Sequence, residues 1–283
     1  MVSRLAAAKI NLALHVVGRR ADGYHDLDTL AVFADIGDRI SVSPAADLSL
    51  SVAGSLASHA PCGGENLVMR AAGLLREHAH VSAGAAIRLD KELPAGAGLG
   101  GGSSDAAATL HALNQLWRLR LGLDELIALG RTLGADLAMC LVARALRARG
   151  TGDRIEVRKS WPALPLVLVW PARAVSTPAA FAGLERGDNG PLPPPTRART
   201  PAELAAWLAK CRNDLEGPAM RLAPEIGDAL GGLRATSGCL LARMSGSGSG
   251  CFAIYSDAAE TEGAAAAMRA NRPDWWVGAT LAR

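Results

Sequence analysis

The sequence predicts an α+β protein of two domains. Its 283 residues exceed a minimal single core and suit two domains of ordinary size. Strand and helix patterns alternate through the first half, and a strongly apolar strand at 164–170 opens a second half that also mixes the two. We therefore expect an N-terminal domain at 1–158 and a C-terminal domain at 159–283, with the boundary near Arg158.

Composition and charge exclude several classes of protein. Hydrophobic residues make up 49% and charged residues 20%, which favours a packed core over disorder. With 4% aromatic residues and a net charge of +3, we expect no nucleic-acid partner. The apolar stretch 161–172 is too short and too rich in proline to span a bilayer, and Lys9 interrupts the apolar start that a signal peptide would need. A cytoplasmic protein without a membrane partner is expected.

Two other residue types have simple interpretations. The cysteines are odd in number and lack CxxC spacing, which predicts reduced thiols and neither a disulfide framework nor a zinc site; they are Cys62, Cys140, Cys211, Cys239 and Cys251. Arginines cluster between 144 and 158, where we expect a solvated basic surface, with a local site for an anionic ligand as the alternative. These are Arg144, Arg147, Arg149, Arg154 and Arg158.

In the first half, apolar residues alternate over 10–16 and predict a strand whose opposite face carries Lys9, Asn11 and His15. A turn at Asp22-Gly23 leads into a returning strand over 24–33. Further strands are predicted at 39–43, 48–52 and 85–89, and helices at 66–80, 103–117 and 124–133. In the last of these, Asp124 is expected as the N-cap and Gly134 as the stop.

The second half begins with the buried strand at 164–170. A proline-rich loop follows, which we expect to be a mobile surface excursion; it includes Pro191, Pro193, Pro194 and Pro195. Helices are predicted at 202–212, 225–234 and 258–270, and strands at 240–244, 251–255 and 275–281.

The most informative segment is a glycine-rich loop that runs directly into a helix. Five of the seven residues from 96 to 102 are glycine, so successive backbone N–H groups have no side-chain cover. The helix that follows adds unpaired N–H donors and the positive end of its dipole, a combination that binds phosphate. The predicted phosphate cradle consists of Pro94, Ala95, Gly96, Ala97, Gly98, Leu99, Gly100, Gly101, Gly102, Ser103 and Ser104.

Three alternative structures fit this loop less well. Gly96, Gly98 and Gly101 form GxGxxG, but residues 90–94 separate them from the preceding strand, unlike a dinucleotide fold. A Walker loop needs a lysine after its last glycine, whereas Gly102 is followed by two serines. A flexible linker would not be framed by a proline and an amphipathic helix.

Several segments together resemble the GHMP kinase superfamily. They are Ala8-Lys-Ile-Asn-Leu12 with Gly18 to His25, the glycine loop to Ala108, and Leu133-Gly-Ala-Asp136, supported by Asn213 to Glu216 and Met244 to Gly248. The Lys-Ile-Asn-Leu and Ala-Asp-Gly-Tyr-His segments are similar to those of the bacterial family that phosphorylates CDP-methylerythritol in the non-mevalonate isoprenoid pathway. The chain departs from this family at Ala7, at Leu137-Ala138 and at Ser249-Gly250-Cys251.

The resemblance implies a two-domain fold with a ribosomal-protein-S5-domain-2-like N-terminal half and a ferredoxin-like C-terminal half. The active site would lie in the cleft between them. It also implies ATP as co-substrate, with Mg²⁺ held mainly by the ATP phosphates and with Ser104 as the candidate for a further contact, but no separate protein metal site. The small-molecule substrate would be CDP-methylerythritol, and the protein would be a monomer or weak homodimer.

The resemblance also assigns roles to single residues. Asp136 would accept the proton of the attacking hydroxyl, and Lys9 would keep that carboxylate ionised and stabilise charge. Taken alone, Asp136 fits a helix N-cap and Lys9 a surface lysine. Asn66 would lie near the adenine of ATP.

Residues for the acceptor come from both halves. His25 would hydrogen-bond the cytosine edge, Tyr24 would pack on the nucleotide, and Phe181 would cover the other face of the base, with Thr177 nearby. Asn11 would reach the same site, or else bond a neighbouring strand, and Phe181 alone fits a core residue. Residues 245–250 fit either a second anion-binding nest or an ordinary glycine turn.

Two rival functions remain at this point. One is a GHMP kinase for another alcohol, such as homoserine or mevalonate, which would have no base for Tyr24 and His25 to bind. The other is a non-catalytic binding protein on the same fold, which would be expected to lack Lys9 or Asp136.

Overall fold

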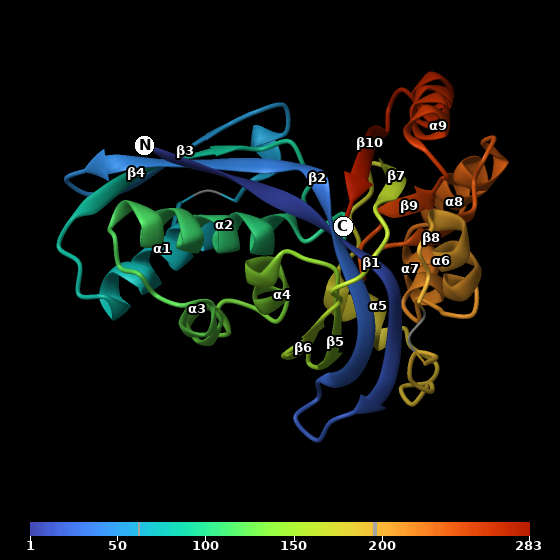
Figure 1. Cartoon of the computed structure of the whole chain (residues 1–283), viewed down its shortest axis with the longest axis horizontal. Coiled ribbons are helices and arrows are strands. Elements are labelled where there is room, and N and C mark those ends of the chain that lie inside the picture. Colours follow the sequence, from blue (N-terminus) through green and yellow to red (C-terminus); the bar gives the residue numbers. More distant parts are fainter. Residues whose placement is uncertain (62, 195–196) are drawn as a thin grey trace. The chain divides into compact units, whose positions relative to one another are not determined.

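The computed structural model describes residues 1–61, 63–194 and 197–283 (Figure 1). The chain forms two compact units: unit 1 comprises Met1–Lys9, Ile36–Ala95 and Gly100–Ala143, and unit 2 comprises Ile10–Asp35, Gly96–Leu99 and Arg144–Arg283. The first two strands, β1 (Val2–Arg19) and β2 (His25–Ala45), contribute residues to both units. The contiguous domain boundary expected near Arg158 stays a prediction.

Unit 1 is a small sheet with helices packed on it. Its further elements are β3 (Leu48–Ala53), the 3₁₀ turns η1 (Ala57–His59) and η2 (Gly63–Glu65), α1 (Leu67–His78), β4 (Gly84–Asp90), α2 (Gly101–Leu116), α3 (Leu123–Gly130) and α4 (Leu137–Val142). β4 runs antiparallel to the second half of β2 and parallel to β3. α1 and α2 lie side by side along this sheet (Figure 1).

Two helices of unit 1, α1 and α2, have clear local causes. Asn66 caps α1, because its side-chain oxygen accepts a hydrogen bond from the Val68 N–H at 2.9 Å. On α2, Ala106, Leu110 and Leu113 are fully buried and form an apolar stripe along one side of the helix.

The predicted cap of α3 was wrong. The helix begins at Leu123 and ends at Gly130, and its N-cap is Gly122 rather than Asp124. Glu125 explains the earlier start, since its carboxylate accepts a hydrogen bond from the Gly122 N–H at 2.8 Å. Asp124 lies in the first turn instead, where a negative charge favours the helix dipole.

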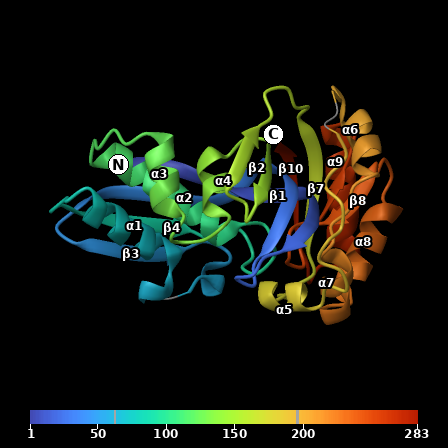
Figure 2. The same cartoon turned by 90° about the horizontal axis from the view of Figure 1, so that it is seen from below.

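Unit 2 contains a second sheet covered by helices. Its further elements are β5 (Leu146–Gly150), β6 (Arg154–Val157), β7 (Leu164–Trp170), α5 (Thr177–Ala182), α6 (Pro201–Leu208), α7 (Glu216–Leu222), α8 (Glu225–Ala235), β8 (Leu241–Met244), β9 (Cys251–Ile254), α9 (Ala258–Asn271) and β10 (Trp276–Ala282). Antiparallel pairing gives the strand order β10-β7-β9-β8, while β5 pairs with β6 and with the first half of β2. α8 and α9 lie beside these strands (Figures 1 and 2).

The arginine cluster is not simply a solvated surface, so that expectation was wrong for Arg147. This side chain is buried on β5 and binds Asp28 of β2 through two hydrogen bonds, one of them from Nε at 2.7 Å. Arg149 and Arg154 are exposed, as expected. A buried carboxylate needs such a partner, because desolvation of an unpaired charge is costly.

The proline-rich loop is anchored rather than free where the structure describes it. Leu192 is buried, and its N–H donates to Asp28 at 3.1 Å. The Gly190 carbonyl bonds the His15 ring at 2.9 Å. Burial lowers the pKa of His15, so the imidazole is neutral near pH 7. Pro195 lies outside the described residues.

Two further features bear on the class of protein. Within residues 1–61, 63–194 and 197–283, the structure contains no helix with the length and hydrophobicity needed to cross a membrane. Four cysteines are free thiols, namely Cys140, Cys211, Cys239 and Cys251. Cys62 lies outside the described residues.

We predict that Arg147→Ala will destabilise the protein by about 3–5 kcal/mol, because it leaves the buried Asp28 carboxylate without its main partner. Urea denaturation of the full chain measures this loss. Arg149→Ala is the matched control: Arg149 is exposed and reaches the same carboxylate at 3.8 Å, so it should cost less than about 1 kcal/mol. Equal losses for both variants would contradict the assigned role of the buried pair.

Candidate active site

Lys9 and Asp136 form an ion pair in unit 1. The Lys9 ammonium lies 2.6 Å from the Asp136 carboxylate. The lysine side chain is 4% exposed and that of the aspartate 42%, so the pair has one buried and one accessible member. Lys9 is therefore not the surface lysine that its position alone suggested. Asp136 does occupy the N-cap position of α4, but its side chain makes no capping bond and faces Lys9 instead.

The start of α2 lies against the lysine stem. Gly100 precedes the helix with φ +68, and a Cβ there would lie 2.9 Å from the Lys9 Cβ. Both facts require glycine at this position. Helix geometry leaves the first N–H groups of α2 without intrahelical partners, so they are available to an anion. Ser104, one turn further, donates its hydroxyl to the Ala7 carbonyl at 2.7 Å and ties the helix to β1.

A buried charged cluster supports the same helix start. Lys91 bonds Asp38 and also Asp105, the latter at 3.0 Å, and all three side chains are at most 4% exposed. Asp38 also accepts hydrogen bonds from the N–H groups of Glu92 and Leu93, at 2.6 and 2.8 Å, directly before the glycine loop. The cluster therefore holds both the entry to the loop and the first turns of α2.

The two carboxylates of this cluster differ in their surroundings. Asp38 accepts hydrogen bonds from two backbone N–H groups in addition to the bond from Lys91. Asp105 accepts a hydrogen bond from Lys91 and lies beside the Asp38 carboxylate, and its Oδ1 has no hydrogen-bond partner among the described atoms. Burial raises the pKa of Asp105 to about 8, so near pH 7 this carboxyl is mostly neutral.

The first part of the glycine loop, residues 96–99, belongs to unit 2 and packs closely against the turn at 245–250. A Cβ on Gly98 would lie 2.4 Å from the Ser245 carbonyl, and a Cβ on Gly248 would lie 2.2 Å from the Gly98 nitrogen. Ser245 donates its hydroxyl to the Gly98 carbonyl at 3.1 Å, and the Gly250 N–H donates to Ala97 at 2.7 Å. These glycines are required by the contact of the two backbones.

The Asn11 side chain is compatible with both roles considered above, a bond to a neighbouring strand and a contact with the acceptor. Its amide nitrogen donates to the Thr29 hydroxyl at 2.8 Å, on the neighbouring strand. Its Oδ1 is buried and has no hydrogen-bond partner among the described atoms. An orphaned acceptor of this kind is unfavourable unless a ligand or water satisfies it.

The predicted base-binding residues lie together in unit 2. The rings of His25 and Phe181 stack, with centroids 5.0 Å apart and planes 22° from parallel. Phe181 also packs against the core of unit 2, as its sequence position taken alone suggested. Burial and the nearby Arg19 lower the pKa of His25, which keeps one ring nitrogen as an acceptor near pH 7. Tyr24 is 65% exposed and directly precedes β2.

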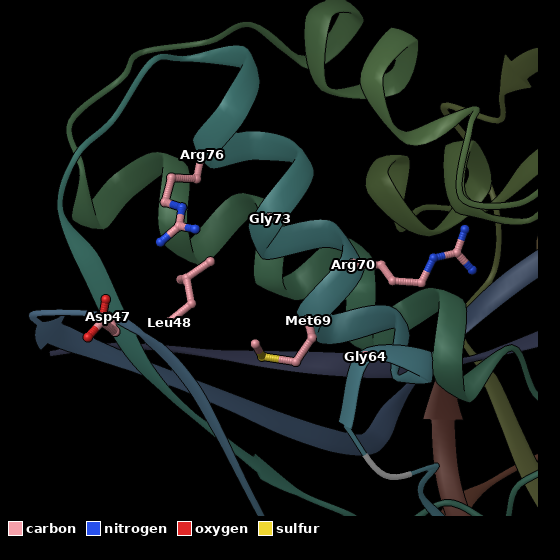
Figure 3. A pocket seen from close by; sticks show the side chains of 7 residues that line it. All are labelled: Asp47, Leu48, Gly64, Met69, Arg70, Gly73 and Arg76. Atoms are coloured by element: carbon pink, nitrogen blue, oxygen red, sulfur yellow. The ribbon is translucent and has the colours of Figure 1, made fainter.

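Asn66 borders an apolar pocket in unit 1. Its amide nitrogen donates to the Pro61 carbonyl at 3.0 Å. Pro61 lines a pocket of about 420 Å³ together with Val52, Ala57 and Ala60, among others. A neighbouring open pocket of about 410 Å³ lies between α1 and residues 47–48, where Arg76 reaches toward Leu48 and Arg70 is directed away (Figure 3).

Sequence reasoning missed the cluster of Asp38, Lys91 and Asp105. Asp38 and Lys91 flank predicted strands and Asp105 lies near the start of a predicted helix, and local patterns gave none of them a role. A charged residue in the first turns after a glycine loop, surrounded by alanines, was the one available signal. The roles of the predicted site residues stay predictions, although the structure brings Lys9 to Asp136 and His25 to Phe181.

Family models match both halves of the chain. The model described as GHMP kinases N terminal domain matches residues 66–144, and the one described as GHMP kinases C terminal matches residues 195–274. These matches confirm the two-domain α+β kinase fold that the sequence predicted.

Individual relatives narrow the family. A 4-diphosphocytidyl-2-C-methyl-D-erythritol kinase of Brucella melitensis is 50% identical over 281 residues, which cover 98% of this chain and 93% of the relative. A crystal structure of 4-(cytidine 5'-diphospho)-2C-methyl-D-erythritol kinase has a TM-score of 0.80 and 39% identity and covers 99% of each chain. The crystal structure of a homoserine kinase from Cytophaga hutchinsonii has a TM-score of 0.66 at 19% identity, covers 100% of this chain and 96% of its own, and shares the fold alone.

The chain is a GHMP kinase, a phosphotransferase of a superfamily that uses ATP as co-substrate. Within that superfamily it belongs to the family of 4-diphosphocytidyl-2-C-methyl-D-erythritol kinases.

We predict that Asp105→Asn will gain stability relative to the wild type as the pH rises. Asp105 titrates near 3.8 in the unfolded chain and at about 8 in the folded protein. Between these values the unfolded chain releases a proton that the folded protein keeps, so the wild-type free energy of unfolding falls with rising pH. Asparagine does not titrate, so the difference between variant and wild type should grow by more than about 1 kcal/mol from pH 5 to pH 8.

Urea denaturation at pH 5, 6, 7 and 8 measures this difference. Thr109→Val is the control, because Thr109 bonds the Asp105 carbonyl through its hydroxyl and does not titrate. Its difference from the wild type should be the same at each pH. A constant difference for Asp105→Asn as well would show that Asp105 is not the group that keeps the proton.

Proposed function

We propose that the protein transfers the γ-phosphoryl group of ATP to the 2-hydroxyl of 4-diphosphocytidyl-2-C-methyl-D-erythritol, a step in isoprenoid precursor biosynthesis. The substrate is the one named for the relatives that are 50% and 39% identical over nearly the whole chain. The observation that carries the proposal is the ion pair of Lys9 with an accessible Asp136 beside the start of α2.

Phosphoryl transfer depends on positioning and on charge stabilisation more than on covalent chemistry by the protein. Asp136 is the accessible member of the pair and would accept the proton of the acceptor hydroxyl. Lys9 would supply a positive charge close to the negative charge of the transferred group. Its burial keeps this charge fixed.

ATP would bind along the glycine loop, with its phosphates at the N–H groups that start α2. The apolar pocket lined by Pro61, Val52 and Ala57 would take the adenine, and Asn66 would hold its wall through the bond to Pro61. Residues 1–61, 63–194 and 197–283 contain no group of three or more His, Cys, Asp or Glu side chains placed to hold a metal ion. Mg²⁺ would be held mainly by the ATP phosphates, whose charge it would neutralise.

The acceptor would bind in unit 2. A neutral His25 can both donate to and accept from the cytosine edge, and Phe181 and Tyr24 offer aromatic faces to the base. Asn11 would satisfy its buried Oδ1 by accepting a hydrogen bond from the acceptor or from a water that the acceptor holds.

The rival functions explain fewer of these features. A homoserine or mevalonate kinase would share the fold but would have no base for His25 and Phe181. A non-catalytic binding protein would have no need for the buried Lys9 beside Asp136.

We predict that Asp136→Asn will lower the rate of phosphoryl transfer to CDP-methylerythritol by about 10²–10⁴-fold, because it removes the proton acceptor. Affinity for a non-hydrolysable ATP analogue should stay nearly unchanged. Single-turnover kinetics and isothermal titration calorimetry measure the two quantities. Asp124→Asn, at an exposed aspartate in the first turn of α3, should leave both unchanged. A near-normal single-turnover rate for folded Asp136→Asn would remove Asp136 from the mechanism.

A further inference from the structure

The turn at 245–250, which clasps the glycine loop, also contacts the segment before α5. Ser249 donates its hydroxyl to the Arg173 carbonyl. Gly96 of the loop would bring a Cβ within 3.2 Å of the Ala174 Cβ. The hydroxyls of Ser247 and Thr177 share a hydrogen bond of 2.7 Å. Segment 173–177 is therefore attached to the loop and its turn at successive points.

α5 begins at the last of these points. Thr177 is its first residue, Pro178 follows in the first turn, and Phe181 lies one turn further along. With only six residues and no side-chain capping bond from Ser176, α5 has little stability of its own. Neighbouring residues therefore hold the N-terminal end of α5 in place. Ser247 is the one that hydrogen-bonds the side chain of Thr177, the first residue of the helix.

The aromatic ring at the other end of α5 is the one that stacks on His25. A continuous set of contacts therefore runs from Gly98 through the turn to Ser247, Thr177 and Phe181, entirely within unit 2. The Gly98 backbone packs directly against the backbones of Ser245 and Gly248, so this end of the loop has no free space in which to move relative to the turn. A change in the loop must move the turn with it.

We propose that Ser247 is a positioning residue that couples the ATP-binding glycine loop to the aromatic residue that covers the acceptor base. This proposal rests on the proposed function, because it takes the loop as the phosphate site and Phe181 as an acceptor contact. When phosphate orders the loop, the Ser247–Thr177 hydrogen bond holds α5 so that Phe181 is in place for the base. Each substrate then raises the affinity for the other by the same factor.

The test measures that factor directly. Isothermal titration calorimetry gives the Kd of CDP-methylerythritol with and without a saturating non-hydrolysable ATP analogue, and the ratio is the coupling factor. The same ratio must result when the analogue is titrated with and without the acceptor. We expect Ser247→Ala to lower this factor by roughly 2- to 10-fold, the range of one hydrogen bond. The kcat should change by less than about twofold, since we assign Ser247 no contact with a reacting group.

Several variants separate coupling from simple damage to the fold. Ser247→Thr keeps the hydroxyl and should restore the factor. Ser247→Cys keeps the size of the side chain but loses the strong donor, and serves if the alanine variant is unstable. Ser256→Ala, at an exposed serine that follows β9 in the same unit, should leave the factor unchanged.

The outcomes distinguish this inference from the function on which it rests. The wild-type protein could phosphorylate CDP-methylerythritol and yet have the same coupling factor as Ser247→Ala and Ser247→Cys. That result would overturn the proposed coupling and leave the proposed function standing. A wild-type protein that neither binds nor phosphorylates this acceptor would overturn both. The proposal is supported if the coupling factor is lower in Ser247→Ala and Ser247→Cys than in the wild type, and is restored in Ser247→Thr.

Discussion

The 2.6 Å ion pair of Lys9 and Asp136 constrains much of unit 1. A lysine with 4% of its side chain exposed must keep a partner, because an unpaired buried ammonium is strongly unfavourable. This requirement places the N-terminus of α4 against β1, and Gly100 brings the start of α2 to the lysine stem. The packing of unit 1 therefore holds Asp136, Lys9 and the start of α2 close together.

The same chain uses its glycine loop in two different ways. Residues 100–104 lie at the start of α2. They are held in unit 1 by packing against Lys9, by the hydrogen bond from Ser104 to Ala7 and by the cluster around Lys91. Residues 96–99 are clasped in unit 2 by the turn that also contacts the segment before α5. One continuous stretch of backbone thus contributes residues to both units.

Local patterns predicted most of the elements, because periodicity and turn residues act over short distances. The two strands predicted at 24–33 and 39–43 were wrong as separate elements, since they form the single strand β2, and β1 is longer than the predicted 10–16. β7 matches the predicted strand residue for residue, and α1 and β3 differ from prediction by at most two residues at each end. The short helices α4 and α5 were missed, since six residues give too little periodicity. Buried charge pairs were missed for another reason. Arg147 and Asp28 are far apart in the sequence, as are Lys91 and Asp38, so each pair comes together only in the folded chain. Lys9 was recognised through family resemblance, whereas its local pattern indicated a surface residue.

The central claim is that this kinase phosphorylates a cytidine-bearing alcohol at its 2-hydroxyl. Phosphorus NMR of the product mixture tests it most directly, with CDP-methylerythritol, homoserine and mevalonate each supplied with ATP and Mg²⁺. We expect a new phosphomonoester signal, coupled to the methylerythritol carbon at position 2, in the first mixture, and no new ester in the other two. Phosphorylation of homoserine or mevalonate at a comparable rate, or an unchanged CDP-methylerythritol, would contradict it.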